Sequence, residues 1–323
     1  MDLKVIKEKV IQGYLISKNE ALEIYEYKDL NQLLEFADKI RTYFCGNGFD
    51  ICTIINAKSG RCSENCKFCA QSSFYKTEIE SYPLLDKDKI VKQAVYNEKE
   101  GILRYSIVTS GKKLSDLEVD RMCEILKDLQ LHSNISLCGS FGLLSFENYK
   151  KLKEAGLSRI HNNLESSRNF FKNICTTHTY DEKVEAIKSA VNAGLTVCSG
   201  GIIGLGESVE DRIDMAIDLR NLGVKSIPIN ILNPIPGTPF GHNTILSEEE
   251  ILRVVAVFRF INPDASIRMA GGRGLLKDKG KRCFMSGANS AISGDMLTTA
   301  GISIKNDMQI IKELGYEVVL CND

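Results

Sequence analysis

The chain has 323 residues, of which 43% are hydrophobic, enough for a large core in one α/β barrel or in two ordinary domains. Its formal net charge of -1 argues against a role on nucleic acid or at a membrane surface. It contains no run of about 18 apolar residues that would predict a membrane span. The amphipathic N-terminus lacks the apolar segment of an export signal, so we expect a cytoplasmic protein.

Cysteine is abundant, with 11 residues in the chain. An odd number argues against a simple disulfide framework, and thiols in the cytoplasm are expected to stay reduced. We therefore expect metal or redox chemistry. So many unprotected thiols suit the cytoplasm of an anaerobe.

The predicted elements begin with a helical segment over residues 1–44, which we expect to cap the rest of the chain. After it, short apolar runs alternate with helical stretches, as in a parallel α/β sheet. The predicted strands are 51–56, 104–109, 134–138, 159–163, 196–199, 226–230, 266–269 and, more weakly, 288–292. The predicted helices are 87–100, 115–130, 146–155, 181–193, 208–222, 248–261 and 305–314, with a poorer helix at 274–284.

Capping boxes, in which a serine and an acidic residue three positions later bond each other's backbone, predict three of the helix starts. They pair Ser115 with Glu118, Ser208 with Asp211 and Ser247 with Glu250. Eight strand–helix units favour a closed or nearly closed (β/α)8 barrel of the TIM type over a doubly wound open sheet. We expect one domain, with the barrel over 45–300 and a C-terminal helix and tail over 301–323.

Three thiols on a polar loop directly follow the first predicted strand, where a barrel places its chemistry. Cys62, Cys66 and Cys69 have C-x3-C-x2-C spacing. Three such thiolates can bind three corners of a [4Fe–4S] cluster and leave the fourth iron open to a substrate or cofactor. A structural zinc site would need four ligands, usually in two pairs, and the sequence has no second C-x2-C pair or H-x3-H. The spacing therefore favours an iron–sulfur cluster.

Two further features have both a structural and a functional interpretation. Residues 200–207 form a glycine-rich turn between a strand and the helix after Ser208. Such a turn either admits a flat polar ligand to the backbone or simply connects strand and helix. Asn163 and Asn230 end the fourth and sixth predicted strands. Their amides could bind a polar ligand, but the residues alone favour a loop cap.

The cysteine triad, with the aromatic Phe68 before its last cysteine, resembles the radical S-adenosylmethionine (SAM) superfamily. In that superfamily the open iron binds the amino and carboxylate groups of SAM, and electron transfer releases a 5′-deoxyadenosyl radical. Further segments across 50–300 resemble the biotin synthase family. They are CAQSS (69–73), YKT (75–77), HNNLES (161–166), TTHTY (176–180), CSGGIIGLGE (198–207), PINIL (228–232), GTP (237–239) and FMSGANS (284–290).

The resemblance implies contacts to both small molecules. For SAM it implies the Phe68 backbone facing the adenine, Ile202 packing beside it, Asn163 and Glu165 at the ribose, and Lys183 at the carboxylate. The family usually has Asp and Arg at the last two positions. Both replacements keep the charge, although Lys cannot form the bidentate fork of Arg. For the substrate, dethiobiotin, the resemblance implies contacts from Asn163 and Asn230.

Members of the family also carry an auxiliary iron–sulfur cluster deep in the barrel, held by three cysteines and one arginine. The matching positions here hold Ser106, Cys138, Cys198 and Arg268, so the second-strand cysteine is absent, although its neighbour Arg104 is retained. Cys52, on the first predicted strand, lies where the family more often has a small polar residue. We predict that Cys52 replaces the missing ligand; the alternatives are that it is merely a buried small residue and that Ser106 is an oxygen ligand.

Three thiolates admit two auxiliary clusters: a [2Fe–2S] cluster completed by Arg268, or a four-iron cube with an extra sulfide on its open iron. Some members from strict anaerobes resemble this 4Fe–5S form, which we favour because the spare sulfide can leave without dismantling the cube. The predicted catalytic set is Cys62, Cys66, Cys69, Cys138, Cys198 and Arg268. The other thiols, expected to be structural, are Cys45, Cys123, Cys175, Cys283 and Cys321.

The activity that the resemblance implies is sulfur insertion at C9 and C6 of dethiobiotin, with ferredoxin or flavodoxin as electron donor and a homodimer as the assembly. One alternative is another radical SAM barrel enzyme, such as a hydrogenase maturase or a methylornithine synthase, which does not need the interior cysteines. A second alternative is an iron–sulfur carrier without turnover, which would not need a SAM pocket.

Overall fold

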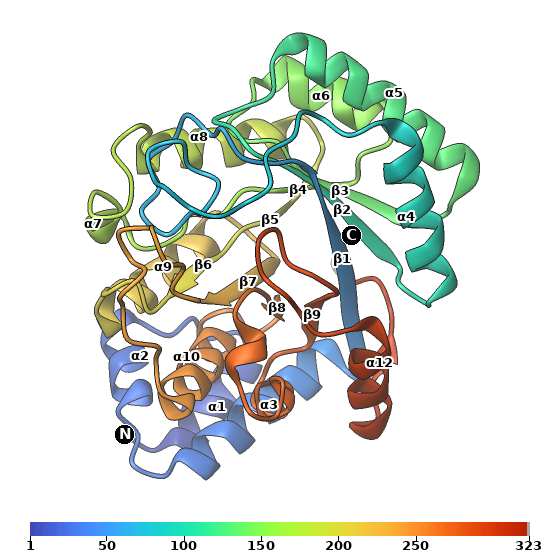
Figure 1. Cartoon of the computed structure of the whole chain (residues 1–323). Helices are drawn as coiled ribbons and strands as arrows, with labels where there is room; N and C mark the ends of the chain where they lie inside the picture. The colour runs from blue at the N-terminus through green and yellow to red at the C-terminus, as the bar shows by residue number, and fades with distance from the viewer. Residues whose placement is uncertain (322–323) are drawn as a thin grey trace.

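The computed structural model describes residues 1–321 and contains a closed parallel β-barrel, as predicted (Figure 1). Neighbouring strands pair around the barrel, and β9 pairs with β1 from Asp50–Ser290 to Thr53–Ser293 to close it. β5 and β6 both pair with β7 and share one of the eight positions. The barrel strands are β1 (Gly48–Lys58), β2 (Arg104–Thr109), β3 (Ser136–Ser140), β4 (Arg159–His161), β5 (Thr196–Cys198), β6 (Gly201–Ile203), β7 (Ser226–Ile231), β8 (Ser266–Met269) and β9 (Ser290–Ser293).

Helices surround the barrel and connect its strands (Figure 1). They are α4 (Lys87–Lys99), α5 (Asp116–His132), α6 (Phe146–Glu154), α7 (Arg168–Phe171), α8 (Tyr180–Asn192), α9 (Val209–Asn221), α10 (Glu248–Ile261) and α12 (Ile304–Glu313). The capping boxes predicted for the starts of α5, α9 and α10 are confirmed, and α8 begins with another, between Thr179 and Glu182. None of the helices in the described part of the chain is long and apolar enough to span a membrane.

Side chains along β2 alternate between the helices outside the barrel and the cavity inside it. Tyr105 points outward, and its hydroxyl donates to the carbonyl of Ile90 on α4. Arg104 and Ser106, its neighbours, line the interior cavity instead. Because successive side chains of a strand face opposite sides, one strand supplies both the helix-packing layer and the polar interior. The barrel centre is therefore available for chemistry.

The fifth barrel position differs from its prediction, because the strand stops after Cys198 and resumes at Gly201. Gly200 passes so close to β7 that a Cβ atom there would lie 1.9 Å from the carbonyl oxygen of Pro228. The Gly201 position is equally crowded, with the carbonyl oxygen of Glu165 2.5 Å from an added Cβ. The two glycines let the chain step sideways between β4 and β7 at the level of the predicted ligand-binding turn.

The poorer helix expected over 274–284 is wrong as a continuous element. The structure has a short 3-10 helix, η1 (Arg273–Leu275), and a separate α11 (Lys281–Phe284). Lys279 and Gly280 both adopt positive φ values, 57° and 86°. A left-handed residue ends a right-handed helix, and two in succession separate the segments.

The two chain ends cover the amino-terminal side of the barrel. The predicted N-terminal helical segment consists of α1 (Leu3–Ile11), α2 (Lys18–Tyr25) and α3 (Leu30–Cys45), with α3 packed on α10 and α1 packed on α3 (Figure 1). Part of the predicted C-terminal tail forms β10 (Glu317–Val318), which pairs with the start of β1. Beyond it, the Cys321 amide donates to Asp50 Oδ2 at 3.2 Å, and Arg159 Nη2 donates to the Cys321 carbonyl at 2.9 Å. Cys321 is thus tied to side chains of the barrel interior.

Candidate active site

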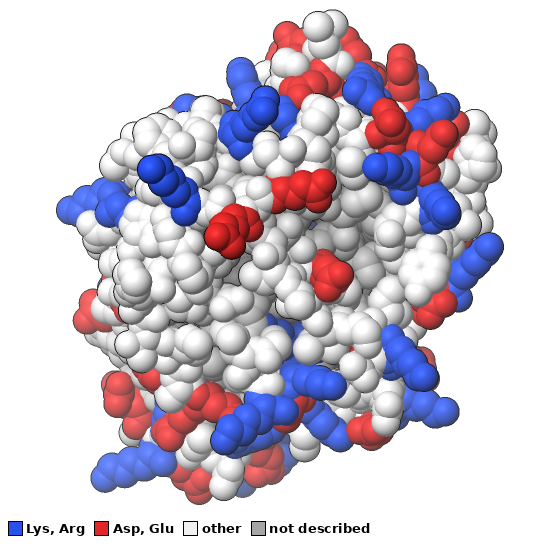
Figure 2. Space-filling view, viewed as in Figure 1, with Lys and Arg blue, Asp and Glu red and all other residues white. Residues whose placement is uncertain are grey.

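The barrel interior holds a cavity of ≈ 410 Å³ that reaches from the cysteine triad to the thiols on the strands. In Figure 2 the molecule is hollowed near the middle of the face shown, and most charged side chains lie above and below that region. Both sets of predicted cluster ligands line this one cavity. A single cavity therefore contains two groups of thiols, one on the loop after β1 and one on the strands.

The triad loop leaves β1 through two left-handed residues, Gly60 and Arg61, with φ values of 71° and 49°. The loop then folds back on itself. The Cys62 amide donates to the Gln71 carbonyl at 3.0 Å, and the Cys69 amide donates to the Cys66 carbonyl at 3.0 Å. These backbone bonds hold all three thiols at the cavity wall without help from a regular element.

Backbone N–H groups are directed at two of the triad sulfurs. Burial raises the pKa of the Cys62 thiol, and hydrogen bonds from the backbone of Glu64 and Gly111 oppose that rise. Burial likewise raises the pKa of Cys69, to about 11, against backbone hydrogen bonds from Gln71 and Ser72. N–H donors aimed at sulfur favour thiolate over thiol, which is the form that a metal cluster binds. The donor set of this loop therefore fits an iron–sulfur cluster.

The residues predicted to contact SAM all line the cavity: Phe68, Asn163, Glu165, Lys183 and Ile202. Glu165 has a positive φ of 71°, and Asn163 Nδ2 donates to its carboxylate at 3.3 Å. Lys183, on α8, is buried, and its Nζ lies 3.4 Å from Asn162 Oδ1. A carboxylate and an ammonium group thus face the same cavity as the triad.

Asn230 and Asn163 also stabilise the barrel itself. Asn230 Nδ2 donates to the Gly201 carbonyl at 3.1 Å, and Asn230 Oδ1 accepts from the Gly271 amide at 2.9 Å. Asn163 Oδ1 accepts from the Gly200 amide at 3.1 Å. Both amides therefore cap neighbouring backbone groups, and each still lines the cavity. An amide has further donor and acceptor capacity, so the cap does not compete with a ligand for the whole group.

Deeper in the barrel, the strands bring together the interior thiols. Cys52 on β1, Cys138 on β3 and Cys198 on β5 are all buried, and the other two thiols act electrostatically on Cys52. Arg268 Nη1 donates to Cys52 Sγ at 3.4 Å, and Arg104 Nη1 donates to Cys138 Sγ at 3.7 Å. The structure thus places Cys52 beside the two cysteines that the sequence predicted as auxiliary-cluster ligands. Ser106 lines the same cavity, opposite Cys138 in the β2–β3 ladder.

Asp50 lies below these thiols and contacts three arginines. Its side chain is fully buried, with Arg104 Nη2 at 3.0 Å, Arg268 Nη2 at 3.0 Å and Arg159 Nη1 at 3.7 Å. Burial would raise the pKa of Asp50, but Arg268 and Arg104 lower it well below its ordinary value. One carboxylate against three guanidinium groups leaves an excess of positive charge under the thiols. Such an environment favours thiolates and anionic clusters, so this donor set fits an iron–sulfur group.

Cys198 differs electrostatically from its two neighbours. Burial raises the pKa of the Cys52 thiol to about 12 and also raises that of Cys138. Burial acts in the same direction on Cys198, but the neighbouring His161 imidazole, with help from Arg268, lowers its pKa to about 6. His161, the partner of Cys198 in the β4–β5 ladder, was not among the predicted site residues. Its position two residues before Asn163, on the same face of the predicted strand 159–163, is the signal that could have found it.

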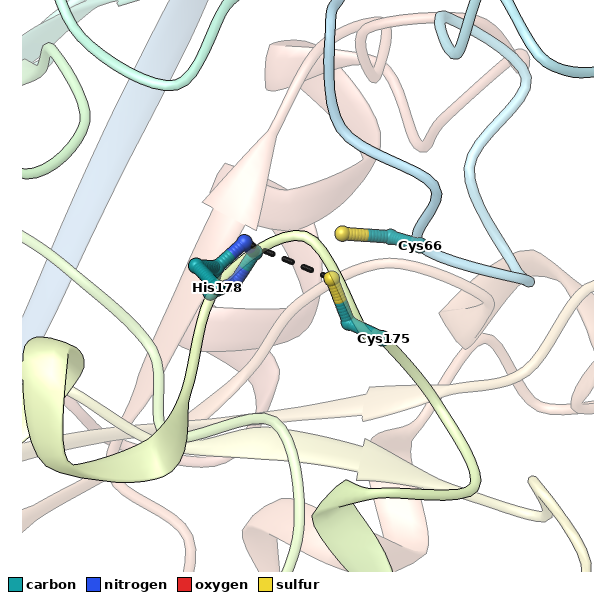
Figure 3. A group of neighbouring side chains, drawn as sticks. All are labelled: Cys66, Cys175 and His178. Atoms are coloured by element: carbon teal, nitrogen blue, oxygen red, sulfur yellow. Dashed lines mark hydrogen bonds between the residues drawn. The ribbon is translucent and has the colours of Figure 1, made fainter.

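A second group that sequence reasoning missed lies beside the triad. Cys175, which we expected to be structural, lies next to Cys66, and its Sγ is 3.3 Å from His178 Nδ1 (Figure 3). His178 Nδ1 also lies 2.5 Å from Glu64 Oε2. The C-x2-H spacing of Cys175 and His178 was visible in the sequence, but only the fold brings it against the triad loop. Among the other cysteines, Cys45 accepts from Arg259 Nη1 at 3.5 Å, a contact between α3 and α10.

Comparisons with known proteins agree with this geometry. Residues 57–219 match the radical SAM superfamily, and residues 228–317 match the biotin and thiamin synthesis associated domain. The biotin synthase of Brachyspira hyodysenteriae is 57% identical over 323 residues, covering 100% of this chain and 97% of that protein. The biotin synthase of Akkermansia muciniphila is 56% identical over 310 residues, covering 96% of each protein.

Solved structures of low identity share the fold. The crystal structure of a methylornithine synthase has a TM-score of 0.84 at 18% identity and covers 98% of this chain and 97% of its own. The FeFe-hydrogenase maturase from Carboxydothermus hydrogenoformans has a TM-score of 0.83 at 16% identity and covers 99% of this chain and 81% of its own. These likenesses concern the fold alone.

The closed barrel, the thiol triad after β1 and the superfamily match define the chain as a radical SAM enzyme of the TIM-barrel type. A [4Fe–4S] cluster and SAM come with that class. Within it, identity of up to 57% over the whole length places the chain in the biotin synthase family, which the sequence motifs had predicted.

Proposed function

We propose that this enzyme is a biotin synthase that inserts sulfur between C6 and C9 of dethiobiotin. The observation that carries the proposal is the single cavity lined by both the triad and the three interior thiols. An enzyme that only cleaves SAM does not need a second set of thiols in the same space. Full-length identity of 57% to a biotin synthase supports the same conclusion.

Cys62, Cys66 and Cys69 would hold the [4Fe–4S] cluster, and the polar residues around them would hold SAM. When bound, these groups supply the 5′-deoxyadenosyl radical that removes hydrogen from dethiobiotin, and an auxiliary cluster supplies the sulfur. Lys183 offers a buried point charge for the SAM carboxylate, and Asn163 and Glu165 offer acceptors for the ribose hydroxyls. Ile202 and Phe68 give the adenine an apolar wall, which also excludes water from the reaction.

For the auxiliary cluster we propose Cys52, Cys138 and Cys198 as ligands, with Arg268 adjacent to them. Arg268 Nη1 donates to two backbone carbonyls and to Cys52 Sγ. Burial acts to lower the pKa of Arg268, but Asp50 and Cys52 raise it above its ordinary value. Arg268 Nη2 also lies 3.0 Å from Asp50 Oδ1, so both terminal nitrogens of the guanidinium already have protein partners. This supports the four-iron cube with an extra sulfide, the 4Fe–5S form, over the [2Fe–2S] form that needs Arg268 as a ligand.

The partners belong to the same proposal. Dethiobiotin would place its ureido ring at Asn163 and Asn230, whose amides supply both donors and acceptors. A ferredoxin or flavodoxin would supply electrons, the enzyme would be a homodimer, and it would act in the cytoplasm.

Anaerobic turnover tests the proposal. The enzyme, loaded with iron and sulfide, is incubated with SAM, a reductant and dethiobiotin, and mass spectrometry measures biotin and 5′-deoxyadenosine. We expect both products, and neither from Cys62→Ala. Deoxyadenosine without biotin would favour another radical SAM reaction, and absence of both from the cluster-loaded enzyme would favour an iron–sulfur carrier.

A further inference from the structure

Three side chains beside the triad form a second constellation of metal-ligand type. The ligand atoms of Cys66, Cys175 and His178 all lie within 4.8 Å of one another. Cys175 and His178 are buried, and Figure 3 shows that their side chains and that of Cys66 point into one small space between two loops. Of these three, only Cys66 belongs to the triad.

We propose that, in the cluster-free protein, Cys66, Cys175 and His178 bind one divalent cation of the zinc or iron(II) type. Thiolate and imidazole are the ligands that such ions prefer. A tetrahedral zinc ion, with bonds of roughly 2.3 Å to sulfur and 2.0 Å to nitrogen, holds its ligand atoms roughly 3.5–3.8 Å apart. Cys175 Sγ and His178 Nδ1, 3.3 Å apart, need only a small adjustment to match.

The loop that carries Cys175 and His178 is fixed to the triad loop by hydrogen bonds between them. Asn65 Nδ2 donates to Thr176 Oγ1 at 2.6 Å, and the Thr176 amide donates to Asn65 Oδ1 at 2.9 Å. The Asn65 amide donates to Thr177 Oγ1 at 3.1 Å. The Lys67 amide adds a bond to the Ile174 carbonyl at 3.0 Å. The three ligands are therefore held together before any ion arrives, which lowers the entropy cost of binding.

Charge and hydrogen bonding at the site also suit a cation. Glu64 is buried, and its Oε2 lies 2.5 Å from His178 Nδ1, so two thiolates and a carboxylate would surround a divalent ion. His178 Nε2 is buried without a hydrogen-bond partner among the described residues. Binding would release the protons of the two thiols to solvent and leave His178 as a neutral imidazole with its proton on Nε2, without any redox change.

The two sites share Cys66, so they compete. Its single thiolate cannot be a full ligand of the mononuclear ion and of the triad cluster at once. The mononuclear ion and the triad cluster would exclude each other. A cation bound at Cys66, Cys175 and His178 would therefore occupy the loop before cluster assembly and would have to leave for assembly to finish. This property belongs to cluster assembly and does not depend on which substrate the loaded enzyme uses.

Cobalt(II) is the probe for the site, since its visible absorption reports tetrahedral thiolate ligation. Cluster-free, reduced wild-type protein is titrated with Co²⁺ under anaerobic conditions, beside Cys175→Ser, His178→Gln, Cys62→Ser and, as a control, Cys123→Ser. We expect Cys175→Ser and His178→Gln each to lose one equivalent of bound Co²⁺, whereas Cys62→Ser and Cys123→Ser keep it. Removing the hydrogen-bond partner of a metal ligand lowers metal affinity roughly 10–100-fold. Removing the ligand itself should lower the affinity for Co²⁺ by more than that.

The Cys62→Ser variant distinguishes binding by the triad from binding by Cys66, Cys175 and His178. If the triad itself binds the ion, Cys62→Ser loses the equivalent and Cys175→Ser keeps it, which would overturn the proposal. Full binding by both Cys175→Ser and His178→Gln would do the same. As a second readout, excess Zn²⁺ added before iron and sulfide should slow the appearance of cluster absorbance in wild type much more than in Cys175→Ser. Equal slowing in the two proteins would contradict competition through this site.

Discussion

At the residue scale, Asp50 sets the charge balance beneath the interior thiols. It is a fully buried carboxylate that three arginines approach, and the backbone of Cys321 also donates to it. A buried ion pair contributes little in net terms while it is intact, but the loss of one partner leaves a desolvated charge. Asp50 is therefore a structural support for the proposed auxiliary site, although it is not one of its ligands.

Asp50→Asn should destabilise the cluster-free protein by roughly 3–5 kcal/mol in urea unfolding at neutral pH. The exposed pair of Lys225 and Asp264 provides the control, since Asp264→Asn should cost less than about 1 kcal/mol. The arginines lower the pKa of Asp50 in the folded state below its ordinary value of about 3.9. Wild type therefore keeps this stabilisation above that pH and loses it as the pH falls further. If the difference in free energy of unfolding between wild type and Asp50→Asn disappeared between pH 7 and 5, the pairing of Asp50 with the arginines would not explain it.

Cys52→Ala should alter the auxiliary iron signal in an anaerobic Mössbauer spectrum of the loaded enzyme and leave the signal of the triad cluster in place. The reason is that Cys52 Sγ accepts from Arg268 Nη1 at 3.4 Å and interacts electrostatically with Cys138 and Cys198. Ser106→Ala, on the neighbouring strand, is the matched variant and should keep the auxiliary signal. An unchanged spectrum for Cys52→Ala together with a changed one for Ser106→Ala would assign the ligand to Ser106 instead.

The site residues divide according to whether local sequence or tertiary structure defines them. The triad could be predicted because its three thiols are close in sequence, and the positions of Cys138 and Cys198 follow from motif matching and strand alternation. Cys175 and His178 could not, since hydrogen bonds between two loops about 110 residues apart bring them to Cys66. Side-chain convergence of this kind leaves no periodic pattern in the sequence.

At the element scale, the sideways step between β5 and β6 places the predicted SAM-binding turn. The Ile202 amide donates to the Glu165 carbonyl at 2.9 Å, which joins the end of the fourth barrel position to the fifth. A strand pattern over 196–199 could be read from the sequence, but the interruption could not. It results from contacts of Gly200 and Gly201 with other strands, and a glycine by itself does not reveal what lies against it.

Gly201→Ala should weaken SAM binding by about 1–3 kcal/mol, because its Cβ would lie 2.5 Å from the Glu165 carbonyl oxygen and 2.4 Å from Met215 Sδ. Calorimetry of SAM binding to the cluster-loaded enzyme measures the change. Gly206→Ala is the control on the same segment: its φ of 97° strains any side chain, but an added Cβ meets no atom within 4 Å. It should lower stability by about 1–3 kcal/mol and keep SAM affinity. Equal SAM affinity for the two variants would show that the crowding at Gly201 does not shape the site.

At the scale of the whole molecule, the barrel places the triad loop at the carboxyl ends of its strands and the interior thiols deeper inside. The triad loop lies after β1, on the side where the strands end, and the interior thiols lie between this loop and the buried Asp50 with its three arginines. The amino-terminal side carries α1 to α3, β10 and Cys321, whose backbone bonds Asp50 and Arg159. The eight-unit pattern in the sequence predicted the closed barrel, because each unit has its own periodicity. The pairing of β10 with the start of β1 and the bonds of Cys321 join distant parts of the sequence and have no comparable signal.

We propose above all that sulfur held at the interior thiols passes to dethiobiotin in the same cavity where SAM is cleaved. The measurement that tests it most directly is a single turnover of enzyme loaded with isotopically labelled sulfide and then freed of unbound sulfide. We predict labelled biotin, with one 5′-deoxyadenosine formed for each carbon that is activated. Deoxyadenosine accompanied by unchanged dethiobiotin, or biotin without the label, would contradict the account.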